Sequence, residues 1–386
     1  MGAAVSWRLG RRPALDGIRG TAVALVVVAH ASVPSSPAHF LGAAGVTSFF
    51  TLSGFLITAL LLAEHDRTGS IDLRAFVVRR ARRLMPALLV LLAVVGLLGL
   101  LIPRFVHPVV YLGALTYTGN WVAVATGGVY DPLGHTWSLA VEEQFYLVWP
   151  LVFLAVNCLP ARWQPRALIA AVVGTALLPL AFKGAGMWLH TYYGSDTRAM
   201  PLLVGCLLAW LIHRSRPAPS LPSVAALSLA LPPLLAATMS TPARTYLLPQ
   251  VVAVLTATAI WAATRGPGLG WLEWPPLVLL GRRSYGLYLW HFPALYTAGL
   301  WLGPLATAMV AIPAALALTA ASWRFVEQPA LAGARTSQHR TVGAAGWRGE
   351  HRGAPRPGAP LDRRGSVGDE AGGPDGGGGG GADTGQ

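Results

Sequence analysis

The feature that most constrains this chain is a series of long apolar runs. A membrane-spanning helix needs about 20 predominantly apolar residues. Such runs cover residues 17–34, 43–63, 85–103, 137–157, 167–187, 200–213, 222–239, 247–264, 284–301 and 304–323. Hydrophobic residues make up 54% of the 386 residues and charged residues only 12%, about half the charged fraction of a soluble domain. The sequence therefore predicts an all-α integral membrane protein, a bundle of about ten transmembrane helices.

The basic residues predict how these helices are oriented. Of 29 basic residues only Lys183 is a lysine, and the formal net charge is +13. Most arginines precede the first run or fill every second loop: Arg8, Arg11, Arg12, Arg67, Arg74, Arg79, Arg80, Arg82, Arg83, Arg162, Arg166, Arg214, Arg216, Arg265, Arg282 and Arg283. The opposite loops hold Arg104, Arg198 and Arg244. Because basic loops favour the cytoplasmic side, we expect a multi-pass plasma-membrane protein with both termini in the cytoplasm.

Composition divides the chain into three parts. Residues 1–13 are a basic cytoplasmic segment, and residues 14–330 carry the apolar runs. Residues 331–386 are rich in Gly, Pro and Arg, and we expect this tail to be disordered and cytoplasmic because it has too few apolar residues to form a core. The first run also resembles a secretory signal, with Ala29-His30-Ala31 as the cleavage site, but Asp16 and Arg19 at its head favour an uncleaved helix.

Several binding classes are not expected. The arginines lie in short loops and not on one basic and aromatic surface, so we expect no nucleic-acid partner. Cys158 and Cys206 have no CxxC spacing, and no zinc signature is present, so no metal site is predicted. The positive charge instead suits anionic lipid or a phosphorylated ligand.

Arg19 and His30 are the first candidate site. Eleven helical steps bring them to within about 20° of one face and separate them by roughly 16 Å. With Arg19 at the inner mouth, His30 is expected near the bilayer centre. This spacing fits a ligand with a phosphorylated head and a long arm ending in a reactive group, as in coenzyme A. The alternative is that Arg19 is an interfacial anchor and His30 a hydrogen-bonded core residue.

Two further segments place charges near the predicted spans. Residues 79–83 carry two arginine pairs spaced i, i+3, which either bind phosphate or anchor the topology: Arg79 with Arg82, and Arg80 with Arg83. Glu142 and Glu143 lie in the run 137–157. They either pair with Arg19 or Arg198, or orient His30.

Polar and aromatic residues recur on single helix faces. Ser138 shares a face with Glu142, one residue after Trp137. In the run 284–301, Ser284, Tyr288 and His291 align on one face, although its aromatic residues can also form an interfacial belt.

Together these segments resemble the membrane-bound acyltransferase 3 family over residues 14–330. The resemblance rests on Arg19 with His30, residues 49–55 (FFTLSGF), 79–86 (RRARRLMP), 137–146 (WSLAVEEQFY), 196–198 (DTR), 284–291 (SYGLYLWH) and 326–329 (VEQP), in the family's order. Thr47 and Gln328 depart from the family's common acidic and basic residues. Some relatives carry an additional C-terminal hydrolase-like domain of the SGNH type, whereas here we expect only the tail.

The resemblance implies an enzyme that transfers an acyl group, usually acetyl, from cytoplasmic acyl-CoA to a carbohydrate hydroxyl. Acyl-CoA is then a substrate and no tightly bound cofactor is expected. The implied catalytic residues are His30, Arg19, Glu142 and Glu143. The implied donor-binding residues are Arg19, Arg79, Arg80, Arg82 and Arg83. The implied substrate-binding residues are Arg198, Tyr288, His291, Trp137 and Ser138.

The mechanism and the acceptor stay open at this point. His30 acts either as a general base on the acceptor hydroxyl or as a nucleophile that forms an acyl-histidine. The acceptor is a polysaccharide, peptidoglycan, a glycolipid or a glycosylated small molecule such as a macrolide. The competing hypothesis is a transporter or flippase that uses Arg19, His30 and the carboxylates as an ion path, and a purely structural scaffold is a third possibility.

Overall fold

Helices joined by short connections build the described part of the chain. The computed structural model describes residue 10 and residues 12–102, 105–128, 132–184, 186–215, 222–265 and 269–332. The elements in these residues are α1 (Pro13–Ala31), η1 (Pro37–Phe40), α2 (Leu41–Thr68), α3 (Leu73–Leu101), α4 (Pro108–Leu115), α5 (Gly119–Thr126), η2 (Gly134–Thr136), α6 (Trp137–Asn157), α7 (Gln164–Gly184), α8 (Trp188–Tyr193), α9 (Ala199–Arg214), α10 (Pro222–Thr238), α11 (Thr241–Tyr246), α12 (Leu248–Arg265), α13 (Pro275–Arg282), α14 (Ser284–Gly299), α15 (Pro304–Ser322) and η3 (Trp323–Glu327). All of them are helical, which confirms the predicted all-α class.

Each of the ten predicted spans coincides with one helix: α1, α2, α3, α6, α7, α9, α10, α12, α14 and α15. Among the described residues, six helical segments are long and apolar enough to cross a membrane. They are Pro13–Ala31, Pro37–Thr68, Leu73–Leu101, Gly134–Asn157, Gln164–Lys183 and Pro304–Ala332. α9 and α10 are apolar but shorter. The helices are therefore confirmed, whereas a count of ten membrane crossings stays a prediction.

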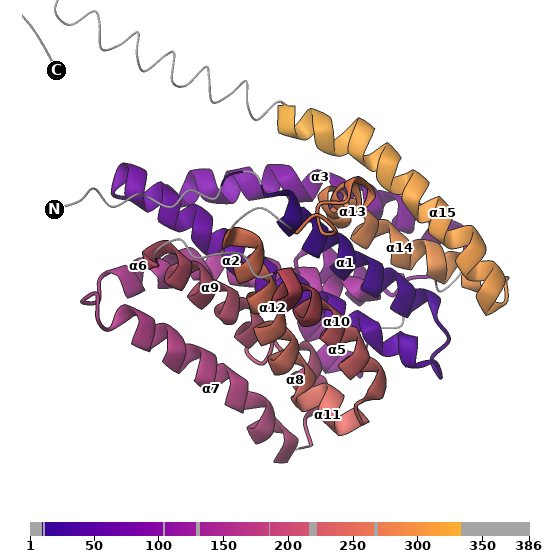
Figure 1. Cartoon of the computed structure of the whole chain (residues 1–386). Helices are drawn as coiled ribbons and strands as arrows, with labels where there is room; N and C mark the ends of the chain where they lie inside the picture. Colours follow the sequence, from indigo (N-terminus) through magenta and orange to yellow (C-terminus); the bar gives the residue numbers. More distant parts are fainter. Residues whose placement is uncertain are drawn as a thin grey trace, which may run out of the picture. The chain divides into compact units, whose positions relative to one another are not determined.

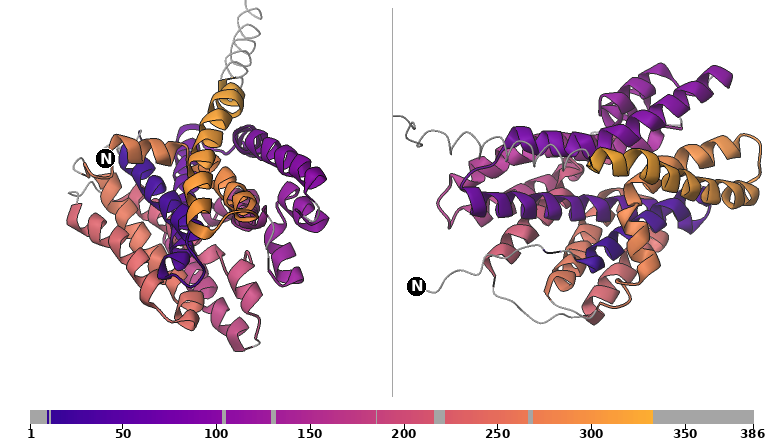
Figure 2. Two further views of the ribbon diagram at one scale, coloured as in Figure 1. Left: turned by 90° about the vertical axis from the view of Figure 1, so that its right-hand side faces the viewer. Right: turned by 90° about the horizontal axis from the view of Figure 1, so that it is seen from above.

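Three of the long apolar helices lie on the outside of the bundle. α3, α7 and α15 are at its periphery (Figures 1 and 2). Only 28%, 11% and 22% of their most apolar windows are buried. Leu100, Leu177 and Leu305 are among the exposed side chains. An apolar surface of this kind is stable in contact with lipid and not with water, as expected for a membrane protein.

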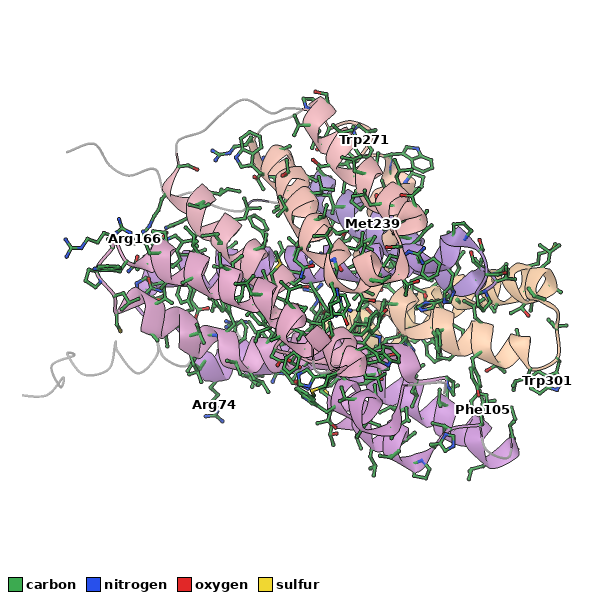
Figure 3. All side chains as sticks on the ribbon, turned by 90° about the horizontal axis from the view of Figure 1, so that it is seen from below. Arg74, Phe105, Arg166, Met239, Trp271 and Trp301 are labelled. Carbon is green, nitrogen blue, oxygen red and sulfur yellow. The ribbon has the colours of Figure 1, made fainter. Side chains whose placement is uncertain are left out.

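Two of the arginine-containing segments predicted to be cytoplasmic lie toward the same end of the bundle. Arg74 and Arg166, from two predicted cytoplasmic loops, lie toward one end of the bundle, and Phe105 and Trp301 lie toward the other (Figure 3). The cytoplasmic assignment of that end stays a prediction. Residues 1–9, residue 11 and residues 333–386 lie outside the described residues, and with them most of the predicted basic N-terminus and tail.

The predicted arginine loop after the second span is helical. α2 continues to Thr68 and ends at Gly69, whose φ of 70° is a left-handed conformation that glycine adopts easily. α3 then begins at Leu73, with the Asp72 side chain accepting a hydrogen bond of 2.8 Å from the backbone N–H of Ala75. Residues 79–83 therefore lie on a helix and not in a loop, which fixes the directions of their side chains.

Residues 104–136 lie between the third and fourth apolar runs, where the charge pattern predicts a long outer loop, but part of this segment is helical. Its described residues form α4, α5 and η2, and they run back along α3. The Tyr111 hydroxyl donates to the backbone oxygen of Leu92 at 3.1 Å, and the Tyr117 hydroxyl contacts the Met85 sulfur at 3.5 Å. This segment thus packs against the bundle and brings Tyr117 to the site described below.

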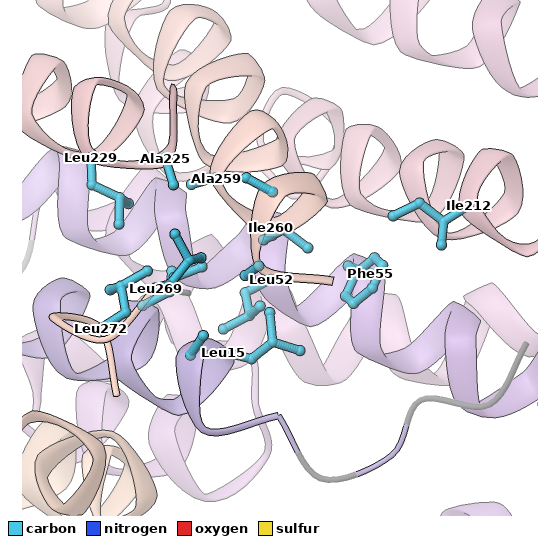
Figure 4. Close-up of a cluster of buried hydrophobic side chains, with 14 of the residues drawn as sticks. Leu15, Leu52, Phe55, Ile212, Ala225, Leu229, Ala259, Ile260, Leu269 and Leu272 are labelled. Atoms are coloured by element: carbon cyan, nitrogen blue, oxygen red, sulfur yellow. The ribbon is translucent and has the colours of Figure 1, made fainter. Parts of the chain in front are cut away.

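α1 lies between two apolar clusters. Ala14, Leu15 and Ile18 pack with α2, α9, α10 and α12 in the cluster of Figure 4. Val23 and Val27 pack with α3, α14 and α15. Because both ends of α1 are held by buried side chains, the polar residues it carries are held rigidly as well.

Close packing with α13 fixes the head of α1. A Cβ on Gly281 would lie 1.7 Å from the Asp16 backbone oxygen, and one on Gly20 would lie 2.3 Å from that of Leu277. Only glycine permits this approach. It brings the neighbouring Arg282 to within 3.3 Å of the Asp16 carboxylate.

Candidate active site

A cavity of about 240 Å³ lies between the helices, with both charged and apolar side chains in its wall. Its walls come from α1, α2, α3, α6, α13 and α14, together with Tyr117 from the segment between α4 and α5. Four arginines and two glutamates line it: Arg19, Arg80, Arg83, Arg282, Glu142 and Glu143. The excess of basic groups makes the cavity suitable for an anionic ligand.

The arginines of α3 divide between two faces. Arg80 and Arg83 line the cavity, whereas the lining, taken over the described residues, includes neither Arg79 nor Arg82. Arg79 forms an ion pair of 3.1 Å with Glu64. The i, i+3 spacing predicted from the sequence thus places Arg80 and Arg83 on one face of α3, and only this pair of arginines faces the cavity. Arg79 and Arg82, both predicted to bind the donor, lie away from it.

Each glutamate has a partner inside the cavity. Glu143 lies 3.6 Å from Arg80, and Glu142 accepts a hydrogen bond of 2.8 Å from the Ser53 hydroxyl. The guanidinium of Arg80 also lies 3.2 Å from the ring centre of Tyr146. One of these carboxylates was a predicted hydrogen-bond partner of His30. In the structure the described hydrogen-bond partner of His30 is instead a histidine, His291. Sequence gives no register between α1 and α6, so it could not exclude the carboxylates.

Arg83 differs from its neighbours in the cavity. It lies within electrostatic reach of Arg19 and Arg80. Among the described residues it forms no ion pair at close range. Arg19, by contrast, is 3.5 Å from Asp16. Arg83 therefore provides the least compensated positive charge in the cavity, where an anionic group would bind most favourably.

One face of α14 leads from the cavity to His30. Ser284 and Tyr288 line the cavity. His291, one turn further on, lies with its Nε2 atom 2.9 Å from Nδ1 of His30. The alignment of these three residues predicted from the sequence is confirmed. Asp16 of α1 is beside Arg282, the last residue of α13, and His30 is beside His291 of α14, so the chain from Arg282 to His291 follows the direction of α1.

His30 occupies the end of a helix. α1 ends at Ala31, three residues before the end of the predicted span, so His30 is in the last helical turn. Its position near the bilayer centre stays a prediction. The ring of His30 packs edge-on against that of Phe292, with 4.8 Å between the ring centres. His30 is partly exposed, and Nε2 has no hydrogen-bond partner among the described residues. The helix end therefore leaves one ring nitrogen of His30 accessible.

The hydroxyl groups of Tyr288 and Ser138 lie in the part of the cavity wall formed by α6 and α14. They lie 2.5 Å apart, and the Tyr288 hydroxyl also donates to the His135 backbone oxygen at 3.0 Å. Ser138 and Tyr288 were both predicted to bind substrate. Both line the cavity, and the ring centre of Tyr288 lies 5.5 Å from that of His291.

His135 is a residue that the sequence did not identify as part of the site. Its ring centre is 5.5 Å from that of His291 and 5.2 Å from that of Phe292. The side chain is 3% exposed. The backbone oxygens of Pro132 and Leu289 are near, but neither ring nitrogen forms a hydrogen bond of good geometry. The only sequence signal was its position two residues before the motif that begins at Trp137.

Tyr117 is a second residue that the sequence did not identify. Its φ of 54° is in the left-handed region, which is uncommon for a residue with a bulky side chain. The side-chain amide of Gln144 donates to its backbone oxygen at 2.7 Å and holds it there. Burial raises the pKa of the Tyr117 hydroxyl, and nearby Glu143 acts in the same direction. Tyr117 therefore contributes a neutral hydroxyl and an aromatic ring to the wall of the cavity.

Arg198 and Trp137 lie apart from the cavity lining. The guanidinium of Arg198 is 5.8 Å from the ring centre of Trp137 and 4.5 Å from that of Tyr192. Its Nε donates to the Tyr192 backbone oxygen at 2.6 Å. Arg198 is only 5% exposed, and burial lowers its pKa. The predicted substrate-binding role of this pair is thus not supported by a position in the cavity, and the two residues form a separate aromatic and basic cluster.

These observations define a helical membrane protein with an arginine-lined cavity and an accessible histidine beyond its far wall. The chain belongs to the acyltransferase domain family, whose model matches residues 12–325. This match confirms the resemblance inferred from the sequence motifs.

Two similar proteins are O-acetyltransferases of bacteria. The peptidoglycan O-acetyltransferase OatA of Listeria monocytogenes is 32% identical over 368 residues, and the O-acetyltransferase OatA of Staphylococcus aureus is 31% identical over 352 residues. Each comparison covers 82% of this chain but only 55% and 57% of the relatives. The chain thus spans little more than half the length of these proteins. No solved structure matches it.

Proposed function

We propose that this protein is a membrane O-acyltransferase that moves an acetyl group from acetyl-CoA to a carbohydrate hydroxyl. The observation that carries the proposal is the common face of α14, which links an arginine-lined cavity to an accessible histidine. An anionic donor and a base for a hydroxyl acceptor require these two kinds of site. Membership of the acyltransferase domain family and the names of the relatives support the same reaction.

The cavity is the proposed site of the donor's phosphorylated part. Arg83, with Arg19 and Arg80 beside it, would bind phosphate oxygens through charge-assisted hydrogen bonds. Arg19 and His30 are eleven positions apart on a continuous helix, which corresponds to roughly 16 Å. The extended arm of coenzyme A is long enough to bridge this separation and present the thioester to His30.

In the proposed reaction His30 is a general base. It takes the proton of the acceptor hydroxyl as that oxygen attacks the thioester carbonyl, and the carbon–sulfur bond then breaks. The proton on His30 passes to the departing thiolate, which leaves as CoA–SH. The acceptor gains the acetyl ester, so atoms and charge balance.

The site of action follows the predicted orientation. We place both termini in the cytoplasm and the bundle in the plasma membrane, with donor entering from the cytoplasmic side. The name of the Listeria relative favours a peptidoglycan sugar as the first acceptor to test. A polysaccharide, a glycolipid or a glycosylated small molecule would be tested beside it.

The test is acetyl transfer by the purified full-length chain. With labelled acetyl-CoA and a panel of sugar acceptors, wild-type protein is expected to yield labelled ester, and His30→Ala to lose at least about 10²-fold in kcat, the usual contribution of a general base. His213→Gln is the matched control, because His213 contacts Asp66 at 3.4 Å and does not line the cavity. Full activity in His30→Ala would refute the mechanism. Movement of a solute without consumption of thioester would instead favour the transporter.

A further inference from the structure

The hydrogen bonds of His291 determine which of its nitrogens carries a proton. Nδ1 of His291 lies 2.8 Å from the Tyr288 backbone oxygen and 3.1 Å from that of Leu287. A carbonyl oxygen only accepts hydrogen bonds. Nδ1 of His291 must therefore be the N–H, and in the neutral ring Nε2 has the lone pair.

The same logic extends to His30. Nδ1 of His30 lies 2.9 Å from Nε2 of His291. Because that nitrogen of His291 accepts, Nδ1 of His30 must donate, and the lone pair of His30 is left on Nε2. The opposite assignment would need a charged His291 ring that is 1% exposed and has no acidic partner among the described residues, which is electrostatically costly.

We propose that His291 is a positioning residue that fixes the tautomer of His30, so that Nε2 of His30 is the basic atom. This inference deepens the proposed function and rests on it for its catalytic meaning. In serine hydrolases a carboxylate holds the catalytic histidine in its reactive tautomer. Here a second histidine does so, and helix backbone carbonyls hold that histidine in turn.

The arrangement gives each proton a defined place during the reaction. The acceptor hydroxyl gives its proton to Nε2 of His30 as the new carbon–oxygen bond forms. The N–H at Nδ1 keeps its hydrogen bond to His291 throughout. When the carbon–sulfur bond has broken, Nε2 gives its proton to the thiolate and His30 returns to the same tautomer for the next cycle.

Replacement of His291 by the two side-chain amides tests the proposal. In His291→Gln an amide oxygen can occupy the place of Nε2 and still accept from His30. In His291→Asn the shorter side chain can hydrogen bond only near the position of Nδ1. The two variants are alike in polarity and differ in reach, so Asn is the matched control for Gln.

The first readout is the division between kcat and KM for acetyl-CoA. We expect His291→Asn to lose about 10²-fold in kcat, within the range of a general base, with KM unchanged. We expect His291→Gln to stay within about ten-fold of wild type. Equal activity of the Asn variant and wild type, or equal losses in the two variants, would overturn the proposal.

The second readout does not depend on acyl transfer. Diethyl pyrocarbonate modifies an unprotonated ring nitrogen, and its reaction at His30 can be followed by peptide mass spectrometry. We expect several-fold slower modification of His30 in His291→Asn and an unchanged rate in His291→Gln. If wild type transfers no acetyl but this pattern holds, the proposed function fails and the tautomer assignment stands. If transfer occurs and the labelling rates are all equal, the assignment fails.

Discussion

Gly281→Ala tests whether contact between α1 and α13 holds the cavity together. The added Cβ would lie 1.7 Å from the Asp16 backbone oxygen and 2.6 Å from its carbonyl carbon. Ordinary van der Waals contact begins at 3.4 Å, so the backbones of α1 and α13 must move apart by most of the difference between 1.7 Å and 3.4 Å. Neither contacting atom belongs to a flexible side chain. Overpacking of this kind costs about 1–3 kcal/mol.

The separation would also disturb ligand binding. Asp16 lies 3.5 Å from Arg19 and 3.3 Å from Arg282, and both arginines line the cavity. We expect Gly281→Ala to lower the Tm in detergent by several degrees and to raise the KM for acetyl-CoA more than it lowers kcat. Gly174→Ala in α7 is the control, because nothing lies within 4 Å of its added Cβ. A Gly281→Ala protein with wild-type Tm and KM would refute the reasoning.

Three further substitutions address the cavity and the packing around it. Arg83→Gln should raise the KM for acetyl-CoA by about 10-fold to 100-fold, the effect of losing one hydrogen bond to a charged group, while Arg74→Gln at the end of α3 should leave KM unchanged. Tyr288→Phe removes the hydroxyl that contacts Ser138 at 2.5 Å. Steady-state kinetics should show a reduced kcat for a normally folded protein. An unchanged kcat would mean that this hydroxyl is dispensable. Gly54→Ala places a Cβ 1.9 Å from the Leu202 backbone oxygen, so thermal unfolding should reveal a loss of about 1–3 kcal/mol unless α2 and α9 can separate freely.

Helical periodicity explains the parts of the site that the sequence predicted. A helix fixes the azimuth of each residue relative to its neighbours on the same helix. For this reason Arg80 and Arg83 share a face, and Ser284, Tyr288 and His291 form one row. Lengths of apolar runs likewise located the helices, because burial in lipid or protein requires apolar side chains over whole segments.

Contacts between helices could not be predicted in the same way. His30 and His291 are separated by 261 positions, and nothing in one sequence sets the axial register of α1 against α14. The same limitation applies to the partner of Glu143, which is Arg80 and neither of the arginines proposed for it. Glu142 and Glu143 were predicted to orient His30 from their carboxylate chemistry alone, without knowledge of their position relative to α1.

The segment 104–136 was misjudged for a different reason. Its helices α4 and α5 have eight residues each, too few to give a periodic signal. A polar network holds them in place: Gln144 donates to the Asn120 side chain at 2.9 Å, and Asn120 donates to Ser195 at 2.9 Å. Such side-chain pairing between distant segments leaves no mark in local composition, so Tyr117 and His135 were not recognised as part of the site.

The geometry of α1 leads to a test that separates donor binding from chemistry. Arg19 and His30 are on one rigid helix, so the distance between phosphate site and base is set by helix rise and not by a mobile loop. A donor that keeps the acetylated arm but lacks the nucleotide phosphates, S-acetylpantetheine, should still reach His30 but bind without the arginines.

The kcat/KM of wild type should therefore be lower with S-acetylpantetheine than with acetyl-CoA. With S-acetylpantetheine, Arg83→Gln should cause no further loss of kcat/KM. The loss caused by His291→Asn should persist, because that residue acts on the base and not on the phosphates. If Arg83→Gln impaired the truncated donor as strongly as acetyl-CoA, Arg83 would support the fold of the site and would not bind phosphate.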